Sequence, residues 1–404
     1  MDPRTADLTT DLPSALPAPA PPGGPLTGRT TVALWEGGDA VRLVEVPLPE
    51  PGPGEVLVRI RLATVCGSDR HTVSGRRAAP VPSVLGHEAV GDVVATGSGG
   101  ATATAGAADA DADADAADGR PLAEGDRVVW GVTVACGACD RCTAGRTAKC
   151  RSVRKVGHEG FASAWPLSGT YAQHILLPRG ATIAHVPDAL PDELASPAGC
   201  ATATVMATLE AAGPLTGRRV LISGAGMLGI TAVAAARAAG AAQVLVTDPD
   251  RARLDLAVRF GATSTHGVET HGVETHGVDV PGPVSDGTAA LGPVDVAIEL
   301  SGASSAVARC LDALDVGGRL VLAGSVAPAP SVPLDAERVV RGWLTITGVH
   351  NYEPRHLRAA LELLARTCDT VPWHELVTPA VGLSQVGRLL TGPAGVAPRA
   401  AVVP

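Results

Sequence analysis

Two hydrophobic patterns divide this chain. Between residues 30 and 62 apolar and polar positions alternate in short runs separated by Pro and Gly, and Val56–Leu62 is the clearest of them. A period of two is typical of strands with one buried face, so this part predicts a β-rich domain. From Arg219 onward, continuous apolar runs such as Val220–Ser223 alternate with Ala-rich helical stretches. This second pattern is typical of a parallel sheet covered by helices.

The second pattern predicts a series of strands and helices. The strands are expected at residues 220–223, 244–247, 294–299, 319–323 and 344–348. One helix is expected to open within 224–229 and end near Ala239, and another covers 357–366. Val307, Cys310, Leu311 and Leu314 have helical spacing, which makes Cys310 a core thiol rather than a metal ligand. We interpret Cys368 in the same way.

Three segments lack the apolar residues needed to form a core. Residues 1–28 are rich in Pro and Ala and predict a disordered tail. Residues 98–124 are mainly Ala, Gly, Thr and Asp and predict a disordered acidic insertion. A calcium-binding loop is the alternative, but it would need a Gly hinge and a terminal Glu. Residues 265–279 repeat THGVE, THGVE and THGVD. Their histidines could gather a metal, but duplication within a surface loop explains the repeat and is preferred.

Composition excludes several classes of function. The formal net charge is −9 and no block rich in Lys or Arg is present, so we expect no nucleic-acid partner. No apolar run is long enough to span a membrane, and residues 1–28 do not have the pattern of a signal peptide. The chain has 8 cysteines without an export signal. We therefore expect reduced thiols in a cytoplasmic protein.

Four cysteines form the most specific local motif. Cys136, Cys139, Cys142 and Cys150 are spaced C-x2-C-x2-C-x7-C. Four thiolates at this spacing can close around one tetrahedral zinc ion. An iron–sulfur cluster is the main alternative. The spacing predicts a metal lobe over residues 136–150, with zinc preferred.

A second set of metal-type residues is spread along the chain. Cys66 follows the predicted strand and opens the polar stretch Cys66–His71, His87 lies beside Glu88, and Cys200 comes much later. Cys66 alone would be interpreted as a buried thiol. Together, two thiolates and one imidazole leave one position of a tetrahedral zinc open for water or substrate. The combination therefore suggests a catalytic zinc.

The glycine motif Gly224-Ala225-Gly226-Met227-Leu228-Gly229 lies between a predicted strand and a predicted helix. In this context Gly224 permits a tight turn, Gly226 lets backbone N–H groups approach a pyrophosphate, and Gly229 permits close packing of the helix. Asp248 ends the next strand, 19 residues after Gly229. Its carboxylate can bind the ribose hydroxyls of NAD and would repel a 2′-phosphate. The motif predicts NAD binding.

Taken in order, these motifs resemble the zinc-containing medium-chain alcohol dehydrogenases over most of residues 30–400. The resemblance implies a GroES-like β domain over 29–187 and 346–404, flanking a doubly wound parallel-sheet Rossmann domain over 188–345. The active site would lie in the cleft between them. A homo-oligomer, either a dimer or a tetramer, is also expected.

The resemblance also implies roles for individual residues. Cys66, His87 and Cys200 would hold the catalytic zinc, although the family also uses Glu or Asp at the position of Cys200. The cysteines of the 136–150 lobe would bind a structural zinc. Asp69 would orient His87, and Glu88 would lie behind the metal.

The same resemblance implies the reaction. The metal would activate an alcohol that gives a hydride to NAD, or the aldehyde in the reverse direction. Ser68 would take the proton of the alcohol and pass it through the cofactor ribose to His71. A non-catalytic NAD-binding protein of the same fold is the alternative, but it would need neither Ser68 nor His71. A metal-free quinone reductase of the same superfamily would lack Cys66, His87 and the four-cysteine lobe.

The substrate is suggested by cationic residues near these motifs. Arg154, Lys155 and His158 follow the four-cysteine lobe, and Arg70 lies within the Cys66–His71 stretch. Residues 154–159 and 196–204 are similar to a subgroup of the family associated with phosphonate metabolism. We therefore hypothesise an anionic substrate held by Arg70 or by Arg154 and Lys155. The alternative is that these cations are surface charges or meet the cofactor pyrophosphate.

Overall fold

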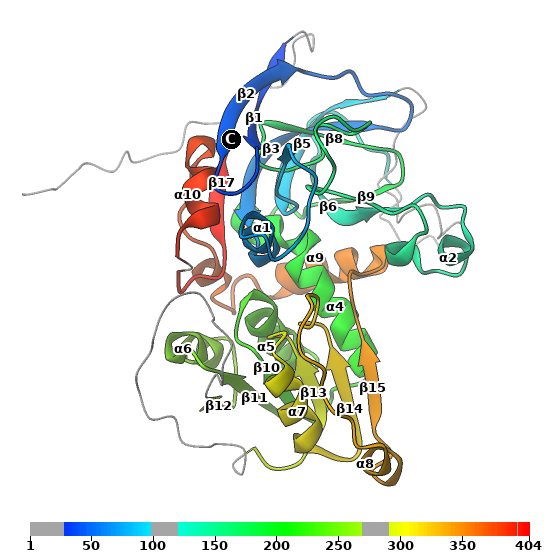
Figure 1. Cartoon of the computed structure of the whole chain (residues 1–404), viewed down its shortest axis with the longest axis vertical. Helices are drawn as coiled ribbons and strands as arrows, with labels where there is room; N and C mark the ends of the chain where they lie inside the picture. Colours follow the sequence, from blue (N-terminus) through cyan, green and yellow to red (C-terminus); the bar gives the residue numbers. More distant parts are fainter. Residues whose placement is uncertain (1–27, 98–119, 269–290, 394) are drawn as a thin grey trace, which may run out of the picture.

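The computed structural model describes residues 28–97, 120–268, 291–393 and 395–404. Figure 1 shows a β-rich body above and a body of parallel strands and helices below, joined by helices at the middle. The predicted tail, nearly all of the acidic insertion and the repeat beyond Val268 lie outside the described residues and stay predictions. Within the described residues, no helix combines the length and the apolar character needed to cross a membrane.

The upper body contains two sheets. The larger has the order β16-β17-β3-β5-β6-β7, with β8 also paired to β3 and β9 to β6, and the smaller has the order β2-β1-β4. All of these pairs are antiparallel except β16 with β17. The strands are β1 (Arg29–Trp35), β2 (Val41–Pro47), β3 (Val56–Val65), β4 (Ser83–Val84), β5 (Ala89–Thr96), β6 (Arg127–Val134), β7 (Arg154–Lys155), β8 (His174–Leu177), β9 (Ala181–His185), β16 (Val381–Gly382) and β17 (Ala400–Val403).

Strand β3 is central to the upper body, because it pairs with β5, β8 and β17. Val58 and Ile60 lie in its main core cluster. The intervening Arg59 reaches Asp92 on β5 at 3.1 Å. The alternating sequence of β3 thus places its apolar side chains in the core cluster and Arg59 beside the carboxylate of Asp92. A strand fixed in this way gives a rigid position to Cys66, which follows its last residue.

The lower body is a six-stranded parallel sheet with the order β12-β11-β10-β13-β14-β15. Numbered within this body, the order is 3-2-1-4-5-6, the arrangement of a dinucleotide-binding Rossmann domain. The strands are β10 (Arg219–Ser223), β11 (Gln243–Asp248), β12 (Ser264–Gly267), β13 (Val294–Glu299), β14 (Leu314–Leu322) and β15 (Thr345–Gly348). The helices are α5 (Met227–Ala238), α6 (Arg251–Arg259), α7 (Ser304–Ala313) and α8 (Ala336–Arg341).

Successive residues of β10 belong to different cores. Val220 and Ile222 lie in the large cluster that includes residues of α5 and α6. Leu221 lies in a second cluster with Val307 and Cys310 of α7. The strand is buried on both faces, which explains its continuous apolar sequence. Cys310 is a core residue with no exposed surface, as its helical spacing predicts.

Helices connect the two bodies. The chain leaves the upper body through α3 (Asp192–Ala195), η2 (Ser196–Gly199) and α4 (Ala201–Ala212), and α9 (Pro354–Thr367) returns to it. Leu357, Leu361 and Leu364 of α9 share the large core cluster with α4 and α5. The remaining helices are α1 (Gly67–Val73), α2 (Asp140–Thr143), η1 (Thr147–Lys149), η4 (Trp373–Leu376), η5 (Leu383–Gln385) and α10 (Val386–Thr391).

The structure moves two predicted boundaries. Residues 346–348 belong to β15 and pair with β14, so they lie in the parallel sheet and not in the return segment. The repeat was predicted as a loop from Thr265, but Thr265–Gly267 forms part of β12 and pairs with β11. The first THG unit continues the sheet because β11 would otherwise present unpaired backbone groups at its edge.

Candidate active site

Cys66 lies where β3 ends and α1 begins. One carboxylate oxygen of Asp69 accepts hydrogen bonds from the Cys66 backbone N–H at 3.0 Å and from the Tyr171 hydroxyl at 2.7 Å. The other oxygen lies 3.1 Å from Nδ1 of His87, although this contact is poorly directed for a hydrogen bond. Asp69 is buried beneath both Cys66 and His87. This position suits a group that orients the imidazole.

Four candidate ligands converge at this point. One ligand atom from each of Cys66, His87, Glu88 and Cys200 lies within 4.8 Å of the other three. They come from the end of β3, the segment between β4 and β5, and the start of α4. Folding therefore brings together residues that are far apart in the sequence. Two thiolates and an imidazole form a donor set that fits zinc.

Glu88 is held by other partners. Nε and Nη2 of Arg399 donate to its two carboxylate oxygens at 2.7 and 2.8 Å, and the Thr64 hydroxyl donates to Oε2 at 2.7 Å. Nη2 of Arg399 also lies 3.4 Å from Sγ of Cys66. The side chains of Arg399 and Glu88 are 4% and 0% exposed. Because both oxygens of Glu88 are bound, the arrangement favours Cys66, His87 and Cys200 as the ligands.

Electrostatics at this site favour an ionised Cys66. A hydrogen bond with Cys200, together with the nearby charges of Arg399 and His87, lowers the pKa of Cys66 well below its usual range. Burial alone would lower the pKa of His87, but Asp69 and Cys66 outweigh it and raise that pKa. Burial raises the pKa of Glu88, and Arg399 offsets this only in part. A thiolate is the form that binds a metal ion.

The predicted relay residues lie on one helix. Oγ of Ser68 is 3.3 Å from Nε2 of His87. His71 follows Ser68 by three residues on α1, a spacing that places the two on neighbouring positions of one helix face. Both residues are partly exposed. A hydroxyl and an imidazole are therefore available beside the candidate metal ligands.

The four-cysteine lobe has sulfur–sulfur distances that fit one metal ion. Sγ of Cys139 lies 3.5 Å from Sγ of Cys142 and 3.9 Å from that of Cys150, and Cys136 lies 4.0 Å from Cys142. Tetrahedral zinc with Zn–S bonds of about 2.3 Å separates its sulfurs by about 3.8 Å. A four-iron cluster would hold the sulfurs farther apart, because each thiolate binds a different iron. The geometry therefore favours zinc.

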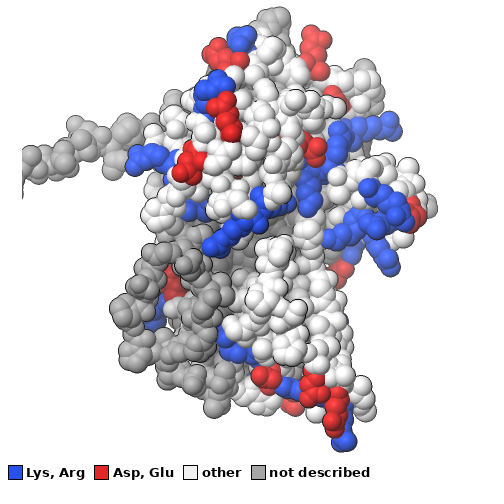
Figure 2. Space-filling model, in the orientation of Figure 1, with Lys and Arg blue, Asp and Glu red and all other residues white. Residues whose placement is uncertain are grey.

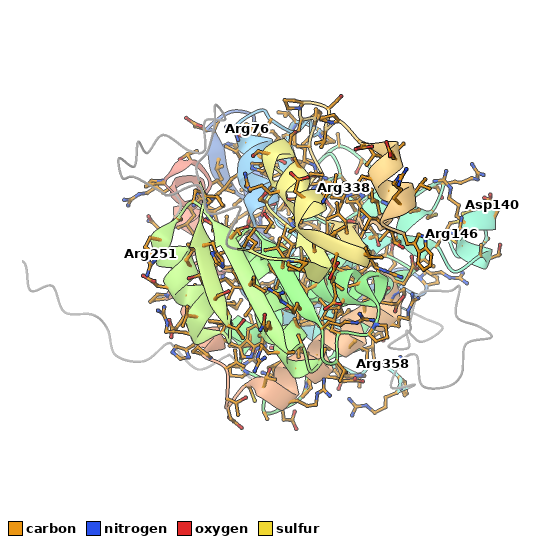
Figure 3. All side chains as sticks on the ribbon, turned by 90° about the horizontal axis from the view of Figure 1, so that it is seen from below. Arg76, Asp140, Arg146, Arg251, Arg338 and Arg358 are labelled. Carbon is orange, nitrogen blue, oxygen red and sulfur yellow. The ribbon has the colours of Figure 1, made fainter. Side chains whose placement is uncertain are left out.

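The lobe projects from the upper body. Figure 3 labels Asp140 and Arg146 at the edge of the molecule, far from Arg251 of α6 on the other side. Hydrogen bonds from the backbones of Arg151 and Cys142 lower the pKa of Cys139 to about 6. Burial and the neighbouring thiols raise the pKa of Cys142 to about 12. Backbone N–H groups thus supply part of the stabilisation that four clustered thiolates need before a metal neutralises them.

The glycine motif forms the turn between β10 and α5. Gly224 has a φ of +101°, and a Cβ there would lie 2.9 Å from the backbone N of Ser301. A Cβ at Gly229 would lie 1.8 Å from the Gly224 carbonyl oxygen. A Cβ at Gly226 would meet nothing within 4 Å, so this position is open to a ligand. Met227 and Leu228 begin α5, where backbone N–H groups are free to bind an anion.

Asp248 lies at the carboxyl end of β11, beside this turn. Its Oδ2 accepts from the backbone N–H of Ala225 at 2.6 Å and its Oδ1 from that of Asp250 at 2.9 Å. Burial raises the pKa of this carboxyl, and the two backbone donors oppose the rise. Besides any contact with a ribose, Asp248 therefore fixes the shape of the glycine turn.

The predicted substrate cations have different environments. Nη1 of Arg70 donates to the Gly392 carbonyl at 2.6 Å, and the Arg154 guanidinium lies 5.4 Å from the centre of the Trp165 ring. Both therefore have structural contacts. The ring of His158 lies 5.5 Å from that of His87, with Nδ1 2.6 Å from the Val156 carbonyl oxygen. Because a carbonyl only accepts, Nδ1 carries the proton and Nε2 is an acceptor beside the site.

Sequence reasoning missed Arg399 and Tyr171. Both are buried, and they hold Glu88 and Asp69 respectively. The sequence did offer one indication of Arg399, because it is a lone arginine directly before the last apolar strand, β17. No spacing rule connects it with Glu88, which lies 311 residues earlier.

Comparison with known proteins agrees with this fold and these donor sets. Residues 52–188 match the family model of the alcohol dehydrogenase GroES-like domain, and residues 228–366 match that of zinc-binding dehydrogenases. L-threonine 3-dehydrogenase of Aeromonas salmonicida is 33% identical over 335 residues, which are 80% of this chain and 83% of that protein. The same enzyme of Deinococcus deserti is 32% identical over 77% of this chain and 80% of that protein.

Solved structures show the same relationship. An alcohol dehydrogenase from Thermotoga maritima has a TM-score of 0.79 at 25% identity, covering 93% of this chain and 99% of that chain. A protein from Sinorhizobium meliloti described as a zinc-binding dehydrogenase, bound to NADP, has a TM-score of 0.74 at 26% identity, covering 93% and 100%.

Fold, sites and comparisons define a zinc-binding, nicotinamide-dependent oxidoreductase acting on CH–OH groups. The chain belongs to the zinc-containing medium-chain alcohol dehydrogenase family.

Proposed function

We propose that this protein transfers a hydride between NAD and a small alcohol that carries an anionic group. The observation that carries the reaction type is the convergence of Cys66, His87 and Cys200 within 4.8 Å, with the Ser68 hydroxyl 3.3 Å from His87. A site with only a structural metal has no need of an adjacent hydroxyl. This arrangement supports catalysis over the non-catalytic alternative.

Cys66, His87 and Cys200 would hold a zinc ion, whose Lewis acidity would make a substrate hydroxyl more acidic. Ser68 Oγ would accept the proton of that hydroxyl while its own proton passes toward His71, which lies on the same face of α1 and would release it to solvent. Asp69, whose carboxylate lies 3.1 Å from Nδ1 of His87, orients the imidazole ring. Arg399 holds both oxygens of Glu88, which keeps this carboxylate from competing with substrate for the metal.

NAD is the proposed cofactor because Asp248 places a buried carboxylate at the end of β11. A 2′-phosphate at this position would meet the charge of the carboxylate. The open space at Gly226 and the start of α5 would receive the pyrophosphate.

Support for an anionic substrate comes from cations beside His158. Burial, with the nearby charges of Arg77 and Lys149, lowers the pKa of Lys155, and Arg77 also acts on His158. Within the described residues, no carboxylate lies within ion-pair distance of Lys155. Figure 2 shows Lys and Arg side chains on the lobe and on the neighbouring edge of the upper body. The proposed anion-binding residues are therefore Lys155, which the sequence hypothesis already included, and Arg77, which takes the place of Arg70 and Arg154.

The turn that carries Lys155 and His158 packs on the candidate metal site. A Cβ at Gly157 would lie 2.2 Å from the carbonyl oxygen of Gly86, the residue before His87. Ser83 and Gly160 form an isolated bridge in the same region. The relatives named L-threonine 3-dehydrogenase act on an alcohol with a carboxylate. A carboxylate and a phosphonate thus remain the two anions to compare.

Steady-state kinetics can test the proposal. The panel consists of a neutral secondary alcohol and its carboxylate and phosphonate analogues, each with NAD and NADP. We expect one anionic analogue to have the highest kcat/KM, and Lys155→Met to reduce that advantage about tenfold, the loss of roughly one charge-assisted hydrogen bond. Arg146→Met, which removes an exposed cation from the same lobe, is the matched control. No turnover with zinc and NAD bound would support the non-catalytic alternative, and equal turnover of the neutral alcohol would remove the anionic group from the proposal.

A further inference from the structure

The carboxylate of Glu353 binds the four-cysteine lobe. It accepts hydrogen bonds from the backbone N–H of Thr147 at 2.9 Å and from that of Ala148 at 3.2 Å, and also from the Thr147 hydroxyl. Thr147 begins η1, whose last residue precedes the candidate ligand Cys150, and the Cys150 N–H donates to the Thr147 carbonyl at 3.0 Å. The position of Cys150 therefore depends on the residue that holds η1.

A second contact lies beside the first. Nζ of Lys149 is 2.6 Å from Nδ1 of His350. Lobe residues 147–149 thus bind residues 350–353 of the segment that leads into α9. Figure 1 shows α9 reaching from the middle of the molecule to the base of the lobe that carries α2.

Tyr352, the residue before Glu353, contacts the peptide that precedes the candidate ligand Cys200. The hydroxyl of Tyr352 donates to the carbonyl of Gly199, the residue before Cys200, and the Val132 backbone also hydrogen-bonds to this hydroxyl. Tyr352 is 7% exposed. A Cβ at Gly199 would lie 2.2 Å from the Trp130 carbonyl oxygen, so β6 packs directly against this peptide. The peptide that carries Cys200 is therefore held between β6 and Tyr352.

Tyr352 and Glu353 share a peptide bond and have little freedom to move separately. Glu353 is the N-cap of α9, with φ −88° and ψ 158°. Its own N–H donates to Nδ1 of His356 at 3.0 Å, and Nε2 of His356 lies 3.0 Å from the carboxylate of Glu210 on α4. The start of α9 is thus anchored to the lobe, to the Gly199 peptide and to α4, the helix that Cys200 precedes.

We propose that Tyr352 and Glu353 are positioning residues that couple the four-cysteine lobe to Cys200, so that an ordered lobe strengthens metal retention at Cys66, His87 and Cys200. When the lobe is closed, η1 holds Glu353, Glu353 fixes Tyr352, and Tyr352 fixes the peptide before Cys200. An open lobe releases Glu353 and lets this peptide shift. Because coupling between binding sites is reciprocal, loss of the second site also weakens the lobe.

Zinc release to an excess of chelator tests this coupling in the full-length protein without any measurement of turnover. Cys66→Ser leaves only the lobe phase of release and Cys139→Ser leaves only the other phase, so the two variants assign the phases seen in the wild type. We expect Cys139→Ser to speed release from the remaining site about tenfold, a loss of about 1.4 kcal/mol. In the Tyr352→Phe background, Cys139→Ser should add no further increase.

Single variants keep the test valid if Cys139→Ser fails to fold. Tyr352→Phe should speed release from the Cys200 site and, because the coupling is reciprocal, also from the lobe, although the hydroxyl contacts only Gly199 and the Val132 backbone. Glu353→Gln should speed both phases, although the carboxylate that it alters is hydrogen-bonded to Thr147 and Ala148 of the lobe and not to the Cys200 site. Glu362→Gln, on the same helix and near Arg358 at 3.9 Å, is the matched control and should change neither.

Two results would overturn the coupling. One is that Glu353→Gln speeds only the lobe phase, and the other is that Cys139→Ser acts equally with and without the Tyr352 hydroxyl. The inference rests on the proposed metal ligands, but it is separable from the proposed reaction. Coupled zinc release without turnover would contradict the reaction alone, whereas uncoupled release with normal turnover would contradict the coupling alone.

Discussion

Arg399 and Glu88 form a bidentate ion pair in the interior of the upper body, with N–O distances of 2.7 and 2.8 Å. The same guanidinium lies 3.4 Å from Sγ of Cys66. One arginine near the end of the chain therefore neutralises a buried carboxylate and stabilises a thiolate at the candidate metal site. Burial alone would lower the pKa of Arg399, but Cys66 and Glu88 outweigh it and raise that pKa.

Replacing Arg399 by Met should strongly destabilise the protein. The change leaves Glu88 buried without its partner, which costs about 3–5 kcal/mol. Denaturant unfolding of the zinc-loaded protein measures the effect. The double variant Glu88→Gln with Arg399→Met should recover most of the loss, because it leaves no buried charge. If Arg399→Met alone is as stable as the wild type, the ion pair does not have this role.

Replacing Asp248 should weaken the preference for NAD. Loss of a charge-assisted hydrogen bond to the ribose costs about 1–3 kcal/mol. Asp248→Ala also removes the acceptor for the Ala225 N–H, so Asp248→Asn, which retains an acceptor oxygen, separates the two effects. The ratio of kcat/KM with NAD to that with NADP is the measurement. Equal efficiency of the wild type with both cofactors would refute the assignment.

The ion pair between α4 and α9 should make stability depend on pH. Hydrogen bonding from Arg355 lowers the pKa of Glu210 to about 2, against the opposing effect of burial and with help from His356. A carboxyl with a lowered pKa contributes stability above its unfolded pKa, about 4.5, and loses it as the pH falls toward 2. Because the Glu210 side chain is 54% exposed, the contribution is about 1 kcal/mol or less.

The measurement for this pair is the difference in Tm between the wild type and Glu210→Gln. The wild type should be more stable at pH 7, and the difference should shrink steadily between pH 5 and pH 2. Glu362→Gln, which removes a carboxylate from α9 near Arg358, serves as the control. A difference that stays constant with pH would show that Glu210 does not act through its charge.

The two low-complexity segments should be dispensable. Deleting residues 101–118, or one THGVE unit beyond Gly267, should leave kcat and KM close to the wild-type values, because segments with few large apolar residues contribute little to a core. A large loss of activity after removal of the repeat would point instead to its histidines as a functional metal site.

Local spacing predicted much of this molecule. The four-cysteine motif and the glycine motif each lie within about 15 residues, so chain geometry alone limits their arrangement. Most strands of the lower body could also be predicted, because strands buried on both faces have continuous apolar sequences. The edge strand β12 was missed, since Ser264–Gly267 is polar and only its pairing with β11 makes it a strand.

Contacts between distant segments could not be predicted in this way. Arg399 meets Glu88, Tyr171 meets Asp69, and Glu353 meets Thr147 across sequence separations of 311, 102 and 206 residues. The cations show the same limit. The sequence hypothesis named Arg70, or Arg154 with Lys155, as anion-binding residues. In the structure Arg70 donates to the Gly392 carbonyl and Arg154 lies against the Trp165 ring.

The central claim is that the chain holds two zinc ions with different roles, and metal analysis combined with turnover tests it most directly. We predict two zinc ions per subunit in the wild type. Cys66→Ser should lose one of them and all turnover while keeping its fold, whereas Cys139→Ser should lose the lobe zinc and become less stable. Iron in place of zinc, or an unchanged zinc content in Cys66→Ser, would contradict the account.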